Sequence, residues 1–323
     1  MEQRQEYWKT IPASYFFLAA MGAMMFVISA VSDLMANQVA LKINGWVSII
    51  ALVIAGCGSL LLLAELTHRS RAHLVNARPF SSVMSFGSVI QTLYMALVFI
   101  YATFFFSFIP WSEMIMIKNG VAVLTIIVAL LYVAYPGVEL GEAKGRAFWN
   151  GGGLVSLFLI SGMTTGSAAL ILLLMLFGYA DTAYTNMIKL FSTAMLLLQL
   201  VAMVGYVFGM KVSANEEARR GANILWCGEL KTSFWWGIIF FGTMLPLIGN
   251  LFMGSVYWLV MSSILVLVGG VYFRIDFLLA AVRIVLPGEE HGEMSRKEIR
   301  EFATMLENRW EEKAVWLESM KEK

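Results

Sequence analysis

The stretch of sequence that decides the fold is the apolar block of residues 234–286, FWWGIIFFGTMLPLIGNLFMGSVYWLVMSSILVLVGGVYFRIDFLLAAVRIVL, whose few charged residues lie near its end. As one helix rising about 1.5 Å per residue, this block would be roughly 80 Å long. The hydrocarbon core of a bilayer is only about 30 Å thick. Gly249, Asn250 and Gly254 supply a turn in the middle of the block. The block therefore predicts two consecutive membrane-spanning helices.

Upstream of this block, six further apolar stretches are each long enough to cross a bilayer. The eight predicted spans are residues 13–36, 45–65, 83–108, 112–139, 152–178, 184–210, 233–252 and 255–286. Eight tryptophans fall at or near the ends of these spans, where their rings prefer the headgroup level: Trp8, Trp46, Trp111, Trp149, Trp226, Trp235, Trp236 and Trp258. Composition agrees, since 59% of the residues are hydrophobic and 14% are charged, against about 25% charged in a soluble domain.

The expected fold is thus an all-α integral membrane protein with eight transmembrane helices. We expect the membrane domain of residues 1–286 to form two four-helix bundles, about 13–139 and about 152–286. Residues 287–323 differ in character and predict a charged, amphipathic C-terminal helix that begins at a Ser295–Glu298 capping box. Such a helix either lies on lipid headgroups or docks a partner subunit.

An even number of spans puts both termini on one side of the membrane. The loops on that side carry most of the lysines and arginines, which predicts that the termini are cytoplasmic. The net charge of +1 provides no electrostatic footprint for nucleic acid.

Histidine and cysteine positions argue against a metal cofactor within the chain. The three histidines, His68, His73 and His291, all lie outside the predicted spans, so facing helices have no histidine pair for a haem. Cys57 and Cys227 are far apart and belong to no ligand motif. We therefore expect neither haem nor metal.

Polar residues gather in two clusters on the side that carries the termini. The first joins spans two and three and reads Glu65, His68, Arg69, Arg71, His73, Arg78 and Pro79. The second closes span four and reads Tyr135, Pro136, Gly137, Glu139, Glu142, Lys144, Arg146, Trp149 and Asn150. Taken alone, these residues are also compatible with helix-end ion pairs, with topology signals and with contacts to lipid headgroups.

The two clusters resemble sequence junctions of the NrfD family, the membrane subunits related to polysulfide reductase. The matching features of the first are Glu65, the basic stretch, Arg78-Pro79 and Met84-Ser85-Phe86-Gly87. The second, YPGVELGEAKGRAFWNGGGLVSLFLISGMTTG, is similar to the family's fourth-to-fifth junction, and Gly269-Gly270 with Arg274 is similar to its C-terminal motif. The resemblance covers about residues 13–286.

This resemblance implies a quinone-reactive anchor in a prokaryotic cytoplasmic membrane, working with a ferredoxin-like iron–sulfur subunit and a catalytic subunit, often a molybdopterin enzyme. The quinone is menaquinone or ubiquinone. Quinol oxidation needs hydrogen-bond donors and a protonatable group, for which the candidates are Glu65, His68, Tyr135 and Glu139. Further candidates to line the pocket, dock the partner or stabilise negative charge are Tyr15, Arg69, Arg71, Arg78, Arg146 and Trp149.

Two alternatives remain open from the sequence. A proton-translocating subunit of a redox complex would use acids such as Asp33, Glu139 and Asp276 as a relay. A solute transporter is less favoured, because Pro246 and Gly137, the broken-helix signals, do not occupy matching positions in two repeats.

Overall fold

The structure, a computed structural model, describes residues 2–4, 10–65, 75, 82–143, 145–284, 304–307 and 309. The chain divides into two compact units, residues 4–283 and residues 1–3 with 284–323. In the second unit, residues 304–307 are helical. The rest of the predicted C-terminal helix lies outside the described residues.

Eight helical segments of the larger unit are long and apolar enough to cross a membrane, which confirms the expected fold class. Six are single α-helices: α1 (Thr10–Leu34), α2 (Gln38–Glu65), α3 (Val83–Thr103), α4 (Ile115–Gly141), α5 (Leu154–Leu176) and α6 (Ala183–Lys211). The seventh span combines η2 (Ser233–Met244) with α8 (Leu245–Phe252), and the eighth is α9 (Val256–Leu279). Short strands β1 (Glu2–Arg4) and β2 (Val282–Ile284) pair in a two-stranded sheet.

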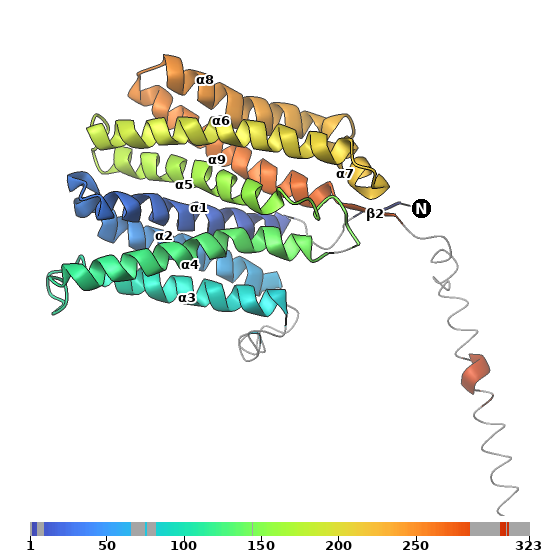
Figure 1. Cartoon of the computed structure of the whole chain (residues 1–323), viewed down its shortest axis with the longest axis horizontal. Coiled ribbons are helices and arrows are strands. Elements are labelled where there is room, and N and C mark those ends of the chain that lie inside the picture. The colour runs from blue at the N-terminus through green and yellow to red at the C-terminus, as the bar shows by residue number, and fades with distance from the viewer. Residues whose placement is uncertain are drawn as a thin grey trace, which may run out of the picture. The chain divides into compact units, whose positions relative to one another are not determined.

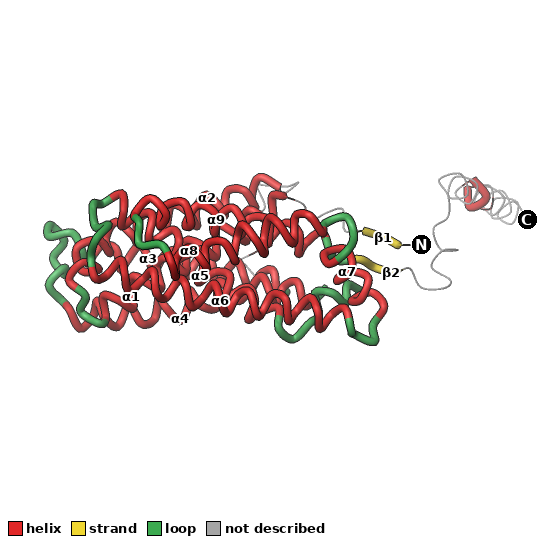
Figure 2. Tube along the Cα trace, turned by 90° about the horizontal axis from the view of Figure 1, so that it is seen from above, coloured by secondary structure: helices red, strands yellow, loops and turns green. Residues whose placement is uncertain are grey.

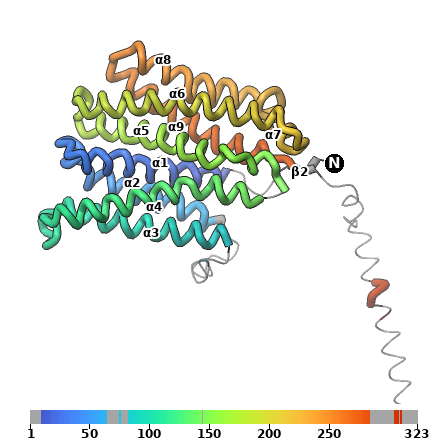
Figure 3. Tube along the Cα trace, in the orientation of Figure 1, coloured from blue at the N-terminus to red at the C-terminus, as the bar shows by residue number. Residues whose placement is uncertain are grey.

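The spans run side by side and pack as two rings of four (Figures 1 and 3). In the first ring, α1 contacts α2, α2 contacts α3, α3 contacts α4, and α4 returns to α1. In the second ring, α5, α6, the η2–α8 segment and α9 close in the same way. Helix α1 is the most buried span and contacts both α5 and α9, so it lies at the junction of the two rings.

Two glycines on α5 allow the rings to approach closely. A Cβ atom on Gly166 would lie 2.6 Å from the backbone nitrogen of Met25 on α1. One on Gly162 would lie 3.0 Å from a methyl group of Val133 on α4. Small residues at helix interfaces let backbones meet in this way, so the Gly162–Gly166 pair serves helix packing.

The seventh span differs from the simple α-helix expected, because η2 has π-helical hydrogen bonding. Pro246, which follows it, has no N–H to donate to the carbonyl of Gly242, so the ordinary α-helical ladder is interrupted there. The wider turns bring Gly242 against α9, where a Cβ atom would lie 2.7 Å from the Cα of Gly269.

The loops lie at the two ends of the bundle of helices, which run side by side (Figure 2). Two predicted spans were too long. The third ends at Thr103 instead of residue 108, and the eighth ends at Leu279 instead of residue 286. Both overruns are mostly apolar, with Ser107 and Arg283 as the exceptions, so hydropathy does not distinguish them from a helix that continues.

A short helix, α7 (Glu216–Trp226), was not predicted because it lies in a polar loop. The side chain of Asn215 caps it by accepting hydrogen bonds from the N–H groups of Glu217 and Ala218, at 2.9 and 3.3 Å. Its buried residues recur at helical spacing: Ala218, Gly221, Ala222 and Leu225. A cap followed by that spacing was the signal available in the sequence.

Candidate functional site

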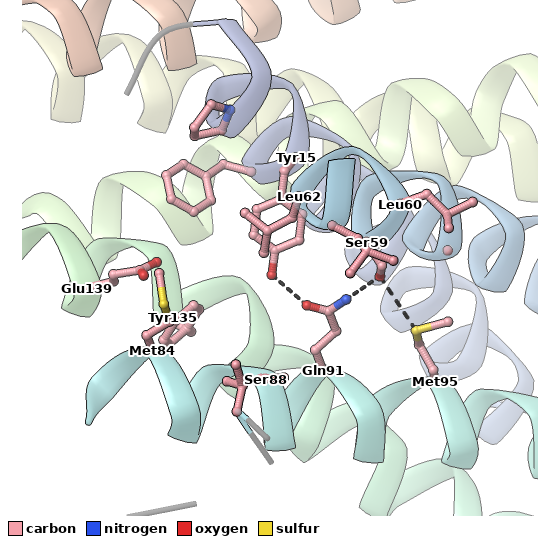
Figure 4. A pocket seen from close by; sticks show the side chains of 15 residues that line it. Tyr15, Ser59, Leu60, Leu62, Met84, Ser88, Gln91, Met95, Tyr135 and Glu139 are labelled. Carbon is pink, nitrogen blue, oxygen red and sulfur yellow. Dashed lines mark hydrogen bonds between the residues drawn. The ribbon is translucent and has the colours of Figure 1, made fainter. Parts of the chain in front are cut away.

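A cavity of about 590 Å³ opens in the first ring, at the end where α1 and α3 begin and α2 and α4 finish (Figure 4). Most of its lining is apolar, with side chains from all four helices of the ring. The polar lining residues are Tyr15, Ser59, Ser88, Gln91, Tyr135 and Glu139. A mostly apolar cavity of this size with a few convergent polar groups is typical of small-molecule sites.

One side of the cavity carries a hydrogen-bonded chain that joins three helices. The hydroxyl of Tyr15 on α1 donates to Oε1 of Gln91 on α3, at 2.7 Å. Nε2 of Gln91 donates to the hydroxyl of Ser59 on α2, whose own proton can go to the carbonyl of Ala55, at 2.8 Å. The Gln91 amide is therefore held in a defined orientation with both of its polar ends in use.

The other side of the cavity carries Tyr135 and Glu139 of α4 (Figure 4). Four residues apart on one helix, they share a face, and their side chains interact. Tyr135 is 6% exposed. Its ring packs directly on Gly87 of α3, where any larger residue would occupy the space of the ring. The glycine of the Met84-Ser85-Phe86-Gly87 motif thus positions the tyrosine.

The rim of the cavity reaches the membrane-facing surface. Leu60 on α2 is 65% exposed and Met84 on α3 is 49% exposed, and both line the cavity. Both residues belong to candidate membrane spans.

Three of the residues selected from the sequence come together here, namely Tyr15, Tyr135 and Glu139. Glu65 is the last residue of α2, and its side chain is outside the description. Four other candidates also lie outside the described residues: His68, Arg69, Arg71 and Arg78.

Arg146 and Trp149 are not among the residues that line this cavity. Nη1 of Arg146 donates to the carbonyl of Ala281, at 2.8 Å, and Nε1 of Trp149 donates to that of Phe277, at 2.9 Å. Partial burial lowers the pKa of Arg146, and the charge of Arg283 acts in the same direction. The two side chains tie the loop after α4 to the end of α9, a contact between residues more than 120 positions apart that local sequence does not reveal.

Sequence reasoning missed Gln91 and Ser59, which hold the hydrogen-bonded chain. The sequence signal used for site residues was mainly an ionisable group within a span, and the Gln91 amide carries no charge. A glutamine inside a membrane helix is nonetheless costly to desolvate. Its position four residues after Gly87, one helical turn further along α3, was a usable signal.

Comparison with known proteins agrees with the membrane architecture. Residues 1–287 match the family described as "Polysulphide reductase, NrfD". The chain is also similar to the "Protein NrfD homolog" of Haemophilus influenzae, with 27% identity over 195 residues. That match covers 54% of this chain and 60% of the relative. Membership of a family of redox-complex membrane subunits supports a membrane-anchor role. All eight candidate membrane spans lie within the matched residues, and this chain belongs to the NrfD family.

Proposed function

We propose that this chain is the quinone-reactive membrane anchor of a respiratory oxidoreductase. In this role it passes electrons between a membrane quinone and the iron–sulfur cluster of a partner subunit. The observation that carries the proposal is the cavity between α1, α2, α3 and α4, with its hydrogen-bonding groups and its membrane-facing rim.

The cavity suits the headgroup of a quinone. Its volume of about 590 Å³ falls within the range of about 300–1,000 Å³ usual for small-molecule sites. The apolar lining matches a flat ring system, and the exposed side chains Leu60 and Met84 mark a rim where an isoprenoid tail can remain in lipid. A bound quinone supplies the two-electron, two-proton redox chemistry, while the protein provides binding and proton handling.

The polar groups divide into two pairs with different tasks. The second N–H of the Gln91 amide is suited to donating to one oxygen of the ring, since the amide is already positioned by the 2.7 Å hydrogen bond that it accepts from Tyr15. Tyr135 offers a hydroxyl to the other oxygen. The Glu139 carboxylate, interacting with Tyr135, holds or releases a proton at Oε. Menaquinone and ubiquinone both have the carbonyl groups that these side chains would recognise.

The partners we propose are a ferredoxin-like iron–sulfur subunit and a catalytic, often molybdopterin-containing, subunit. They would bind at the end of the bundle that holds the cavity, because electron transfer requires the cluster to be close to the quinone. This end also carries the start of α1 and the finish of α9. We propose that it faces the cytoplasm of a prokaryotic cell, following the charge bias of the loops.

The test uses the complex that co-purifies with the full chain. Tyr135→Phe removes the hydroxyl and Glu139→Gln removes the ionisable group, each with almost no change in shape. We expect each variant to lower quinol-linked electron transfer by about 10²-fold, the lower end of the usual contribution of a general acid or base.

Tyr257→Phe is the matched control, because Tyr257 is 88% exposed and lies away from the cavity. Wild-type turnover in both cavity variants would refute the assignment of this site. A complex that contains no iron–sulfur subunit and neither binds nor oxidises quinols would refute the proposed function.

A further inference from the structure

Polar residues recur at every seventh position along the inner face of α4: Lys118, Thr125, Tyr132 and Glu139. Seven residues are nearly two helical turns, so the four side chains form one seam along the helix. Thr125 and Tyr132 are fully buried and Lys118 is 9% exposed. At about 1.5 Å per residue the seam is roughly 31 Å long, which equals the hydrocarbon thickness of a bilayer.

The seam begins at Glu139 in the cavity and reaches a buried ion pair at the opposite end of the ring. Nζ of Lys118 lies 3.0 Å from each carboxylate oxygen of Asp33 on α1. The hydroxyl of Tyr101 on α3 donates to Oδ2 of Asp33 at 2.5 Å, and Nδ2 of Asn44 on α2 donates to that hydroxyl at 3.3 Å. Buried charges in a membrane span are costly and usually mark ion or proton pathways.

Two tyrosines occupy the middle of the ring with unsatisfied hydroxyls. Tyr94 on α3 and Tyr132 on α4 are fully buried, and their rings stack with centroids 5.2 Å apart. Neither hydroxyl has a hydrogen-bond partner among the described residues. Leaving a buried hydroxyl unpaired costs about 1–3 kcal/mol, so phenylalanine would pack there at lower cost. Bound water is the usual partner of such groups.

One of the two hydroxyls, that of Tyr132, is close to a residue of the cavity. The Tyr132 hydroxyl is near that of Tyr15, which lines the cavity. Pro136, one turn further along α4, has no N–H to donate to the Tyr132 carbonyl, which leaves an additional acceptor for water at the same point.

We propose that the first ring contains a proton path, running from Glu139 and Tyr15 through Tyr132, Tyr94 and Thr125 to the Asp33–Lys118 pair. This inference rests on the proposed function. Oxidation of one quinol yields a quinone, two electrons and two protons. The electrons go to the iron–sulfur partner at the cavity end, and the protons leave by the path to the opposite membrane face. Bound water bridges the side chains where they are not in contact.

The experiment reconstitutes the full complex in liposomes that contain a pH-sensitive dye. A short-chain naphthoquinol is the donor, and a membrane-impermeant acceptor, reduced through the iron–sulfur subunit, selects the complexes whose partner faces outward. We expect wild-type complex to acidify the interior, by two protons for each quinol oxidised.

Tyr94→Phe is the decisive variant, since it removes only an unpaired hydroxyl. We expect unchanged or higher thermal stability, unchanged binding of the oxidised naphthoquinone, and a loss of at least about tenfold in both turnover and interior acidification. The double variant Asp33→Asn/Lys118→Met, which removes both charges together, should show the same loss of turnover and interior acidification with unchanged naphthoquinone binding. Tyr257→Phe is the control for a tyrosine outside the path.

The outcomes separate the two proposals. Interior acidification and turnover at wild-type levels in both path variants would overturn the proton path and leave the quinone site intact. Quinol oxidation by wild-type complex without interior acidification would also overturn the path. Failure of the wild-type complex to bind the naphthoquinone would overturn the proposed function, and the path with it.

Discussion

Gly87 and Tyr135 are in direct contact across the α3–α4 interface, and the tyrosine ring fills the space that a Cβ atom at residue 87 would need. This relationship connects a sequence motif to the site, because the glycine allows the ring to lie against α3 with its hydroxyl in the cavity. The orientation of Tyr135 therefore depends on a residue of another helix.

Substituting this glycine should displace the tyrosine. We expect Gly87→Ala to destabilise the protein by about 1–3 kcal/mol, the usual cost of overpacking, and to weaken naphthoquinone binding as strongly as Tyr135→Phe. Titration of the purified complex with a naphthoquinone measures this. Gly209→Ala on α6 is the control, since nothing lies within 4 Å of its Cβ position. Wild-type affinity in Gly87→Ala would contradict this role of the contact.

Gln91 should affect substrate binding more than its half-buried position alone predicts. Gln91→Leu removes the acceptor of the Tyr15 hydroxyl and the N–H donor to the Ser59 hydroxyl, and the loss of the Tyr15 acceptor costs about 1–3 kcal/mol. We expect the KM for quinol to rise about tenfold. Gln199→Leu is the control, because Gln199 on α6 is buried and likewise accepts a hydrogen bond, from Thr164, but it lies outside the cavity. The two variants should be similarly destabilised, and an equal KM in both would argue against the role of Gln91.

The Asp33–Lys118 pair should show strong coupling in stability. Removing one partner leaves the other as an uncompensated buried charge, which costs about 3–5 kcal/mol. We expect Asp33→Asn and Lys118→Met each to lower the thermal stability markedly, and the double variant to recover most of the loss. The exposed pair Glu216–Arg220 on α7 is the comparison, with coupling of about 0.3–0.5 kcal/mol. Additive losses in the Asp33 and Lys118 variants would show that the pair is not coupled.

The contact between the two rings should tolerate no added methyl group at Gly166. A Cβ atom added at Gly166 would lie 2.6 Å from the backbone nitrogen of Met25 on α1, and the backbone cannot move aside as a flexible side chain can. We expect Gly166→Ala to lower the unfolding free energy by about 1–3 kcal/mol, measured by thermal unfolding in detergent. Gly205→Ala, where the Cβ position is open, should be neutral. Equal stability of the two variants would contradict the close packing of α1 and α5.

The charge bias of the loops predicts which side carries the termini. We expect a C-terminal fluorescent-protein fusion to fluoresce and a C-terminal alkaline phosphatase fusion to be inactive. Both results are those expected for a cytoplasmic terminus. The opposite pair of results would place the termini, and with them the cavity, on the outer face.

Much of the fold could be predicted because each membrane span depends on its own local sequence. The length of an apolar run and the thickness of the bilayer together decide whether a segment crosses, without reference to the rest of the chain. The helix ends were less predictable, since Phe104–Phe108 is as apolar as the helix before it. Tyr135 and Glu139 were predictable as site residues because they share one face near the end of a span.

The sequence by itself thus determined eight crossings, their order, and the end of the molecule at which polar residues gather. Only the tertiary structure decided which of those residues meet. It brought Gln91 to Tyr15, joined Asp33 to Lys118, and directed Arg146 and Trp149 to α9 rather than to the cavity. The physical reason is that membrane helices are apolar on all sides, so hydropathy fixes their length but not their rotation. Rotation is decided by packing, at contacts such as Gly87 against Tyr135 and Gly166 against Met25.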